Sequence, residues 1–263
     1  VGLSLGVDAL ALSSVQTAED IRQAKPLIRA YGSQVPPVAK PERHSAVDNL
    51  EAHLKHSDGI MVARGDLGIE IPLPNPPALP KRIIKACNHL STPVIVATQM
   101  LLSMVNSPVP TRAETTDVAN AVLDGADCVM LSEETAMGSY PVETVGYMRK
   151  ITREAEEYLL ENRHLLQPDD ESGPPEFLAY TACLLAEKTG AQHLVSHTLS
   201  GSSARLLSSC RPRQTIRALS PDPCVLHSLN FTWGVQPHHV QEDPEIPHSI
   251  RVQRFVATNP LFP

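Results

Sequence analysis

Several features that mark other classes of protein are missing from this 263-residue sequence. Aromatic residues make up only 4%, and no block of consecutive basic residues accompanies the net charge of −7, which argues against a nucleic-acid-binding surface. No apolar run approaches the roughly 18 residues of a membrane-spanning helix. The first residues lack the charged region and cleavage site of a signal peptide. We therefore predict neither nucleic acid nor membrane as a partner.

Cysteine pairs of the metal-binding type are also missing. The five cysteines are odd in number and widely spaced, and no Cys-x-x-Cys occurs. This usage predicts reduced thiols in a cytoplasmic protein. The first residue is valine rather than methionine, so we expect a further segment upstream.

Strand-like and helix-like patterns alternate along the chain. The apolar runs typical of strands are 9–14, 35–40, 59–64, 93–98 and 127–132. Helical spacing begins near Thr17 and recurs at 45–54, 81–89, 111–123 and 141–160. A strand and a helix repeating every thirty residues or so predict βαβ units and a parallel sheet.

The polar segment 165–175, rich in Asp and Pro, is predicted to be a linker that ends a first domain over 1–164. After it a second alternation occupies 176–263 and predicts a smaller α/β domain. Its expected helices are 176–188, 202–210 and 222–231, and its expected strands are 193–198, 215–220 and 235–240. The last twenty residues, rich in proline, lose the pattern.

The stretch Gly59–Gly68 carries the strongest local signal of a site. A continuously apolar run suits a parallel strand buried on both faces, and here it breaks at Gly65-Asp66. The carboxylate of Asp66 therefore comes just after the carboxyl end of a buried strand, where α/β proteins place their ligands. A turn with an aspartate cap is the alternative for such a dipeptide taken alone.

Polar side chains follow all five strands of the first domain. They are Ser13 and Ser14, Lys40 and Glu42, Arg64 and Asp66, Thr98 and Gln99, and Ser132 and Glu134. Barrel active sites draw residues from several strand ends, so this pattern favours one pocket. Glu42 and Asp66, on neighbouring strands, could share Mg²⁺ (or Mn²⁺), a metal that is commonly bound through one or two carboxylates. A surface ion pair between Lys40 and Glu42 is the alternative.

Several longer blocks carry a resemblance to a known family. They are 61–72 (MVARGDLGIEIP), 81–84 (KRII), 93–100 (PVIVATQM), 110–114 (PTRAE), 117–125 (DVANAVLDG) and 130–132 (MLS). Together and in this order they resemble pyruvate kinase, and the similarity runs from about Gly6 to Val240. The resemblance implies a parallel (β/α) barrel of TIM type, incomplete because only its last five strands are present, followed by the smaller α/β C-terminal domain.

The resemblance also implies roles for single residues. Lys40 matches the catalytic lysine that stabilises the transferred phosphoryl group. Glu42 and Asp66 match the two carboxylates that hold the divalent metal. Thr98 matches the threonine that binds the substrate carboxylate, together with backbone N–H groups of Gly65 and Asp66.

At the fifth strand, Ser132 matches a serine proposed to help deliver a proton to the enolate carbon. The substrates so implied are phosphoenolpyruvate and ADP, with pyruvate and ATP as products. The resemblance further implies a K⁺ ion, whose ligands belong to the part of the family not matched here, and a homotetramer in which helix 111–124 takes part. The turn Thr198–Ala204 corresponds to a phosphorylated-effector pocket in some members. Capping of the following helix by Ser200 or Ser202 is the alternative.

The sequence departs from the family at two positions beside the predicted site. Pro41 replaces an aliphatic residue between Lys40 and Glu42, and proline fixes φ and removes an N–H. Glu133 replaces a glycine after Ser132. Two other functions are alternatives: a magnesium-dependent lyase or aldolase of pyruvate-type substrates, and a non-catalytic remnant. We expect activity to be impaired in this chain because the family's lid is not matched.

Overall fold

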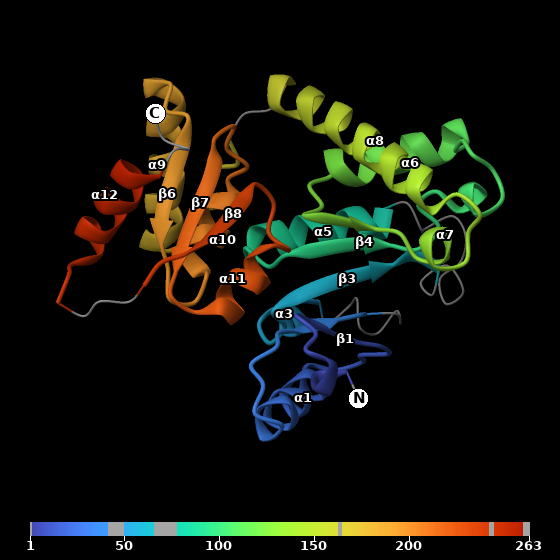
Figure 1. The fold of residues 1–263 in the computed structure, drawn as a ribbon, viewed down its shortest axis with the longest axis horizontal. Coiled ribbons are helices and arrows are strands. Elements are labelled where there is room, and N and C mark those ends of the chain that lie inside the picture. Colours follow the sequence, from blue (N-terminus) through green and yellow to red (C-terminus); the bar gives the residue numbers. More distant parts are fainter. Residues whose placement is uncertain (1, 42–49, 66–77, 163–164, 242–244, 260–263) are drawn as a thin grey trace. The chain divides into compact units, whose positions relative to one another are not determined.

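The computed structural model describes residues 2–41, 50–65, 78–162, 165–241 and 245–259. The chain divides into two compact units, Val1–His164 and Leu165–Pro263. Each unit contains one parallel sheet (Figure 1).

The first unit is built on a five-stranded parallel sheet in the order β1-β2-β3-β4-β5. Its strands are β1 (Leu10–Leu12), β2 (Pro37–Ala39), β3 (Gly59–Ala63), β4 (Val94–Ala97) and β5 (Cys128–Met130). Its α-helices are α1 (Ala18–Ala30), α3 (Leu50–Leu54), α5 (Ala78–His89), α6 (Arg112–Leu123), α7 (Glu133–Ala136) and α8 (Pro141–Asn162). Two 3₁₀ turns, η1 (Leu3–Leu5) and η2 (Leu102–Val105), complete the unit.

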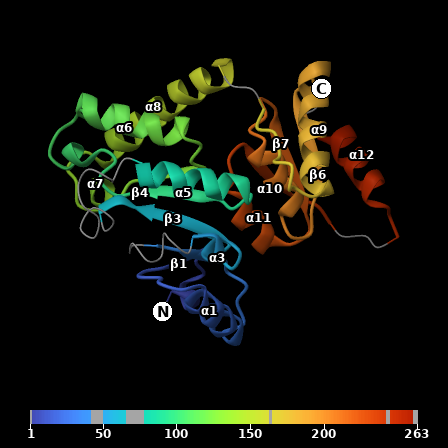
Figure 2. The same cartoon turned by 180° about the vertical axis from the view of Figure 1, so that it is seen from behind.

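The sheet follows the order of the strands along the chain because each strand pairs in parallel with the next. Ile60 of β3 lies opposite Val94 of β4, and Ile95 of β4 lies opposite Cys128 of β5. Right-handed crossovers place the connecting helices on one face of such a sheet. Accordingly α1 contacts β2, α5 contacts β3 and β4, and α6 contacts β5 (Figures 1 and 2). The predicted parallel sheet is confirmed.

Two helices of this unit begin at the capping residues that the sequence indicates. Thr17 caps α1 and Thr111 caps α6, and each hydroxyl accepts the N–H of the third helical residue. The side chains of Asp20 and Glu114 accept the N–H of the respective capping threonine. These reciprocal bonds satisfy donors that would otherwise lack a partner, so they locate the helix starts.

One helix begins earlier than expected. The sequence predicts 81–89, whereas α5 begins at Ala78 and includes Pro80 in its first turn. The prediction was wrong because proline is tolerated where the backbone N–H has no partner within the helix. The buried face of α5 carries Ile83, Ile84 and Cys87, which join the core around Ile60.

The second unit is a three-stranded parallel sheet in the order β6-β7-β8 with helices against it. The strands are β6 (His193–His197), β7 (Thr215–Ser220) and β8 (Val235–His239). The helices are α9 (Pro174–Thr189), α10 (Ser202–Ser209), α11 (Pro223–Leu229) and α12 (His248–Thr258). The core forms where α9, α10 and α11 meet Ile216 and Ala218 of β7.

The last helix, α12, corrects the expectation that regular structure ends near residue 243. It packs against β6, where the rings of His197 and His248 are 4.5 Å apart. Phe255 lies 5.2 Å from the ring of His238 on β8. No residue of α12 is fully buried, and its contacts are made by these few side chains rather than by a long apolar stripe, which explains why periodicity failed to predict it. Among the described helices, none is both long and apolar enough to cross a bilayer.

Candidate active site

The carboxyl ends of the five strands in the first unit are joined in pairs by side-chain hydrogen bonds. One join links the ends of β1 and β2, another links β3 and β4, and a third links β4 and β5. Each involves residues that the sequence places directly after a strand. Polar groups thus link the ends of β1 and β2, and separately those of β3, β4 and β5, at the edge where the sequence predicts a site.

Lys40 follows β2, and its ammonium donates a 3.2 Å hydrogen bond to the hydroxyl of Ser13, which follows β1. The backbone N–H of Lys40 donates to the carbonyl of Leu12, so the parallel pairing of the two strands continues to this residue. Lys40 is half-buried, whereas Ser13 is exposed. The positive charge is thus held at the edge of the sheet.

Gly65 and Thr98 connect the ends of β3 and β4. The N–H of Gly65 donates a 2.7 Å hydrogen bond to the hydroxyl of Thr98, and this hydroxyl donates in turn to the carbonyl of Ala97. Both residues were predicted to bind a substrate carboxylate. In this structure the two groups bind each other, so a bound carboxylate would have to replace their mutual hydrogen bond.

The turn after β4 has an unusual backbone. Thr98 and Gln99 have φ values of 69° and 53°, in the left-handed region that non-glycine residues seldom adopt. The guanidinium of Arg64 donates to the carbonyl oxygens of both residues, at 3.0 and 3.4 Å. The same guanidinium forms an ion pair with Asp117 of α6. Arg64 therefore stabilises a strained turn whose first residue carries a predicted site hydroxyl.

Ser132 and Glu134 lie at the end of β5. The Glu134 side chain is fully buried, and its carboxylate accepts the N–H of Ser132 at 2.7 Å and the N–H of Leu101 at 3.2 Å. One carboxylate thus fastens the residue after β5 to the loop after β4. Ser132 is the first residue before the short helix α7, and its hydroxyl is not used as a helix cap.

The two predicted metal ligands, Glu42 and Asp66, lie outside the described residues. Their neighbours Pro41 and Gly65 follow strands β2 and β3, which are adjacent in the sheet. Two carboxylates offer the hard oxygen ligands that Mg²⁺ prefers, so the donor set fits that metal. Among the described residues, no group of three or more His, Cys, Asp or Glu side chains is arranged to hold a metal ion.

Sequence reasoning did not identify two polar contacts behind the site. Asp117 pairs with Arg64 although 53 residues separate them. Glu114, noted as a capping residue, also accepts hydrogen bonds from the N–H and the hydroxyl of Ser103, at 2.7 and 2.6 Å. Both acids lie in the segments 110–114 and 117–125 that resemble the family. This clustering is the feature of the sequence that could have indicated their contacts.

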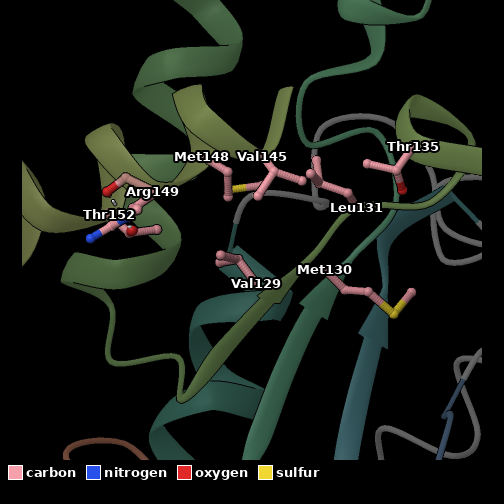
Figure 3. Close-up of a pocket in the computed structure, with 8 residues that line it drawn as sticks. All are labelled: Val129, Met130, Leu131, Thr135, Val145, Met148, Arg149 and Thr152. Carbon is pink, nitrogen blue, oxygen red and sulfur yellow. Dashed lines mark hydrogen bonds between the residues drawn. The ribbon is translucent and has the colours of Figure 1, made fainter. Parts of the chain in front are cut away.

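A separate hollow of about 460 Å³ lies beside β5 and α8 (Figure 3). Val129 of β5 lies on one side of it, and Val145 and Met148 of α8 lie on the other. None of the predicted site residues lines it. Among the described strands, β5 pairs only with β4, so the apolar hollow opens beside an unpaired strand edge.

In the second unit the turn after β6 is held by its own side chains. The hydroxyl of Thr198 accepts the N–H of Gly201 at 2.8 Å, and the guanidinium of Arg205 donates to the carbonyl of Ser200 at 3.3 Å. The capping position of α10 is Gly201, and the Ser200 hydroxyl accepts the N–H of Ser202, the first residue of the helix, at 3.4 Å. Neither serine is the capping residue itself, but Ser200 does satisfy one donor at the start of the helix. An arginine beside the turn is compatible with an anionic ligand.

These features define an α/β protein of the barrel type, with polar groups at the carboxyl edge of a parallel sheet. Residues 1–145 match the family model "Pyruvate kinase, barrel domain", and residues 176–258 match "Pyruvate kinase, alpha/beta domain". The chain therefore belongs to the pyruvate kinase family.

Individual relatives agree with the family models. Pyruvate kinase 2 of a Synechocystis strain is 45% identical over 262 residues, covering 99% of this chain and 44% of that protein. A pyruvate kinase of Agrobacterium vitis is 48% identical over 237 residues, covering 89% and 48%. The crystal structure of a pyruvate kinase from Cryptosporidium parvum superimposes with a TM-score of 0.87 at 36% identity, covering 97% and 54%. The chain spans about half the length of these proteins.

Proposed function

We propose that this chain supplies the part of a pyruvate kinase active site that contains Lys40. This active site transfers a phosphoryl group from phosphoenolpyruvate to ADP and forms pyruvate and ATP. The observation that carries the proposal is the barrel-domain match over 1–145, within which Lys40, Thr98 and Ser132 all follow strands at one edge of the sheet. Phosphoryl transfer depends mainly on positioning and on positive charge around the transferred group. A lysine held at this edge suits that requirement.

In this proposal each residue has one task. Lys40 stabilises negative charge on the transferred phosphoryl group, and its contact with Ser13 holds the side chain in place. Thr98 binds the substrate carboxylate with the backbone N–H groups of Gly65 and Asp66. Ser132 takes part in delivering a proton to the enolate carbon, and its position is set through the N–H group that Glu134 accepts.

The proposed divalent metal, Mg²⁺ or Mn²⁺, would be held by Glu42 and Asp66. When bound, it supplies positive charge next to the phosphoryl and enolate oxygens. Replacing Asp66→Ala should weaken Mn²⁺ binding measured by paramagnetic relaxation. Unchanged affinity would remove Asp66 from the metal site. A requirement for K⁺ is also proposed, with ligands supplied by the part of the relatives that this chain does not match.

Four further properties are proposed from the family. Residues 165–175 connect the barrel domain to the C-terminal domain, and the protein works in the cytoplasm. The subunits form a tetramer, and exposed Arg112 of α6 contacts a partner subunit. Glu114 of the same helix is instead bound to Ser103 and Thr111 within the subunit. A phosphorylated effector binds at Thr198–Ala204.

The sharpest test joins this chain to the upstream half of the Synechocystis relative, so that a whole barrel can form. The chimera should release pyruvate from phosphoenolpyruvate and ADP in the presence of Mg²⁺ and K⁺. Lys40→Met should lower the rate by on the order of 10²–10³, the usual effect of losing one preorganised electrostatic contact. Sedimentation of the same chimera tests the tetramer, and the change in its rate on adding sugar phosphates tests the effector.

Three outcomes would count against the proposal. A folded chimera that releases no pyruvate would identify this chain as a non-catalytic remnant. Release of pyruvate from an aldol substrate, without any from phosphoenolpyruvate and ADP, would favour the lyase alternative. Retention of full activity by the Lys40→Met chimera would assign the phosphoryl contact to another residue.

A further inference from the structure

Two cysteines of the second unit, 27 residues apart in the sequence, meet between helices α9 and α10. Cys183 lies on α9, and Cys210 directly follows α10. The sulfur of Cys183 is 3.8 Å from the carbonyl oxygen of Leu207, and the sulfur of Cys210 is 3.5 Å from that of Leu206. Because these carbonyls belong to consecutive residues, the two sulfurs occupy the same small region. Each thiol donates to its carbonyl, and the interaction between the two thiols shifts the pKa of both.

The other three cysteines differ from this pair. Cys87 is buried in α5 and Cys128 lies on β5, both in the first unit. Cys224, at the start of α11, is exposed. Cys183 and Cys210 instead belong to one buried cluster in the core of the second unit. Their exposed fractions are 0% and 3%, so they lie inside the core of the unit rather than on its surface.

The interaction between the two thiols is the largest cause that raises the pKa of Cys183, and burial raises this pKa further. The same interaction lowers the pKa of Cys210, against the opposing effect of burial. The thiolate is the reactive form of cysteine, so loss of one proton from the pair leaves a nucleophilic sulfur beside a thiol.

We propose that Cys183 and Cys210 form a reversible disulfide when the protein meets a hydroperoxide, the simplest being hydrogen peroxide. The Cys210 sulfur attacks one peroxide oxygen, the O–O bond breaks, and a sulfenic acid forms with release of hydroxide or water. The Cys183 sulfur then attacks the Cys210 sulfur and displaces its hydroxyl as water. Overall, two thiols and one hydrogen peroxide give one disulfide and two waters.

The disulfide would fasten the end of α10 to α9. The segment between the two cysteines contains β6 and the turn 198–201, where the proposed effector loop begins. A covalent link closes this segment into a loop and restricts its opening. The inference concerns the second unit by itself and does not depend on the proposed kinase activity.

The experiment treats the 263-residue chain with hydrogen peroxide, blocks remaining thiols with iodoacetamide under denaturing conditions, and maps tryptic peptides by mass spectrometry. Trypsin places the three cysteines of this unit in separate peptides, 164–188, 206–213 and 218–251. We expect the first two peptides to appear joined, with loss of two hydrogens, and to separate on reduction with dithiothreitol. Cys210→Ser should abolish this product, and the matched control Cys224→Ser should leave its yield unchanged.

Amide hydrogen exchange provides the second measurement. In the oxidised chain, exchange in α10 should be slower than in the reduced chain. The proposal is overturned if Cys183 and Cys210 are recovered alkylated while Cys224 is oxidised, or if Cys210 is oxidised to sulfinic acid without a crosslink. A crosslink that leaves exchange in α10 unchanged would overturn the proposed restraint of the loop.

Discussion

The backbone N–H of Gly65 donates a 2.7 Å hydrogen bond to the side-chain hydroxyl of Thr98. This bond joins the ends of β3 and β4 at the edge that carries the proposed substrate site. Arg64 supports the same junction from the neighbouring position by donating to the carbonyl of Thr98. A strained turn is therefore held from both sides, by a side chain and by a backbone group.

Replacing Thr98→Val should destabilise the first unit. Valine has nearly the same shape but cannot accept the Gly65 N–H, and a donor left without a partner in a partly buried site costs roughly 1–2 kcal/mol. Urea unfolding followed by circular dichroism measures the change. Thr98→Ser keeps the hydroxyl and is the control, so an equal loss in both variants would contradict the role assigned to the hydrogen bond.

Replacing Glu134→Gln should also lower stability, by about 1–3 kcal/mol, because glutamine has only one side-chain oxygen for two backbone N–H groups. Glu133→Gln is the matched control, since Glu133 is the adjacent residue and is exposed. Unfolding of the two variants under the same conditions gives the comparison. If the two variants lose the same amount of stability, the buried carboxylate of Glu134 does not stabilise the contact between the ends of β4 and β5.

Lowering the pH should reduce the stability of the first unit because Glu114 becomes protonated. Burial alone would raise the pKa of this carboxyl, but hydrogen bonds from Ser103 and Thr111 outweigh burial and hold the pKa below its ordinary value of 4.5. Because the folded pKa is the lower one, the stabilising contribution is fully present above about pH 4.5 and is lost as the pH falls through the folded value.

The measurement is the free energy of unfolding over a series of acidic pH values. Glu114→Gln should make the dependence on pH shallower in this range, whereas Glu161→Gln, at an exposed position near the end of α8, should leave it unchanged. A Glu114→Gln variant with the parental pH dependence would show that other carboxyls account for the acid sensitivity.

The 263-residue chain alone should show little or no kinase activity. It matches about half of each relative, and removal of a single preorganised contact already lowers the rate of an enzyme by on the order of 10²–10³. The unpaired edge of β5 further favours association with other strands. A pyruvate-release assay with Mg²⁺, K⁺, ADP and phosphoenolpyruvate measures this, and turnover of about 1–10³ s⁻¹ would contradict it.

Local patterns in the sequence were sufficient for much of the fold. The apolar runs at β3 and β4 indicated strands buried on both faces, and the threonines at 17 and 111 located two helix starts. These signals act within a few residues of each other, so they can be read without knowing the fold. They predicted the order of the strands in both units and most of the helices between them, and the sequence blocks that resemble pyruvate kinase indicated the family.

Other features were decided only by tertiary packing. Arg64 contacts Asp117, Glu134 links the loops after β4 and β5, and Cys183 lies near Cys210. The partners in each contact are too far apart in the sequence for a local periodicity to relate them. The start of α5 and the presence of α12 also required the structure. The physical reason is the same in each case: a local pattern selects a helix or a strand, whereas the partner of a buried polar group depends on which elements pack beside it.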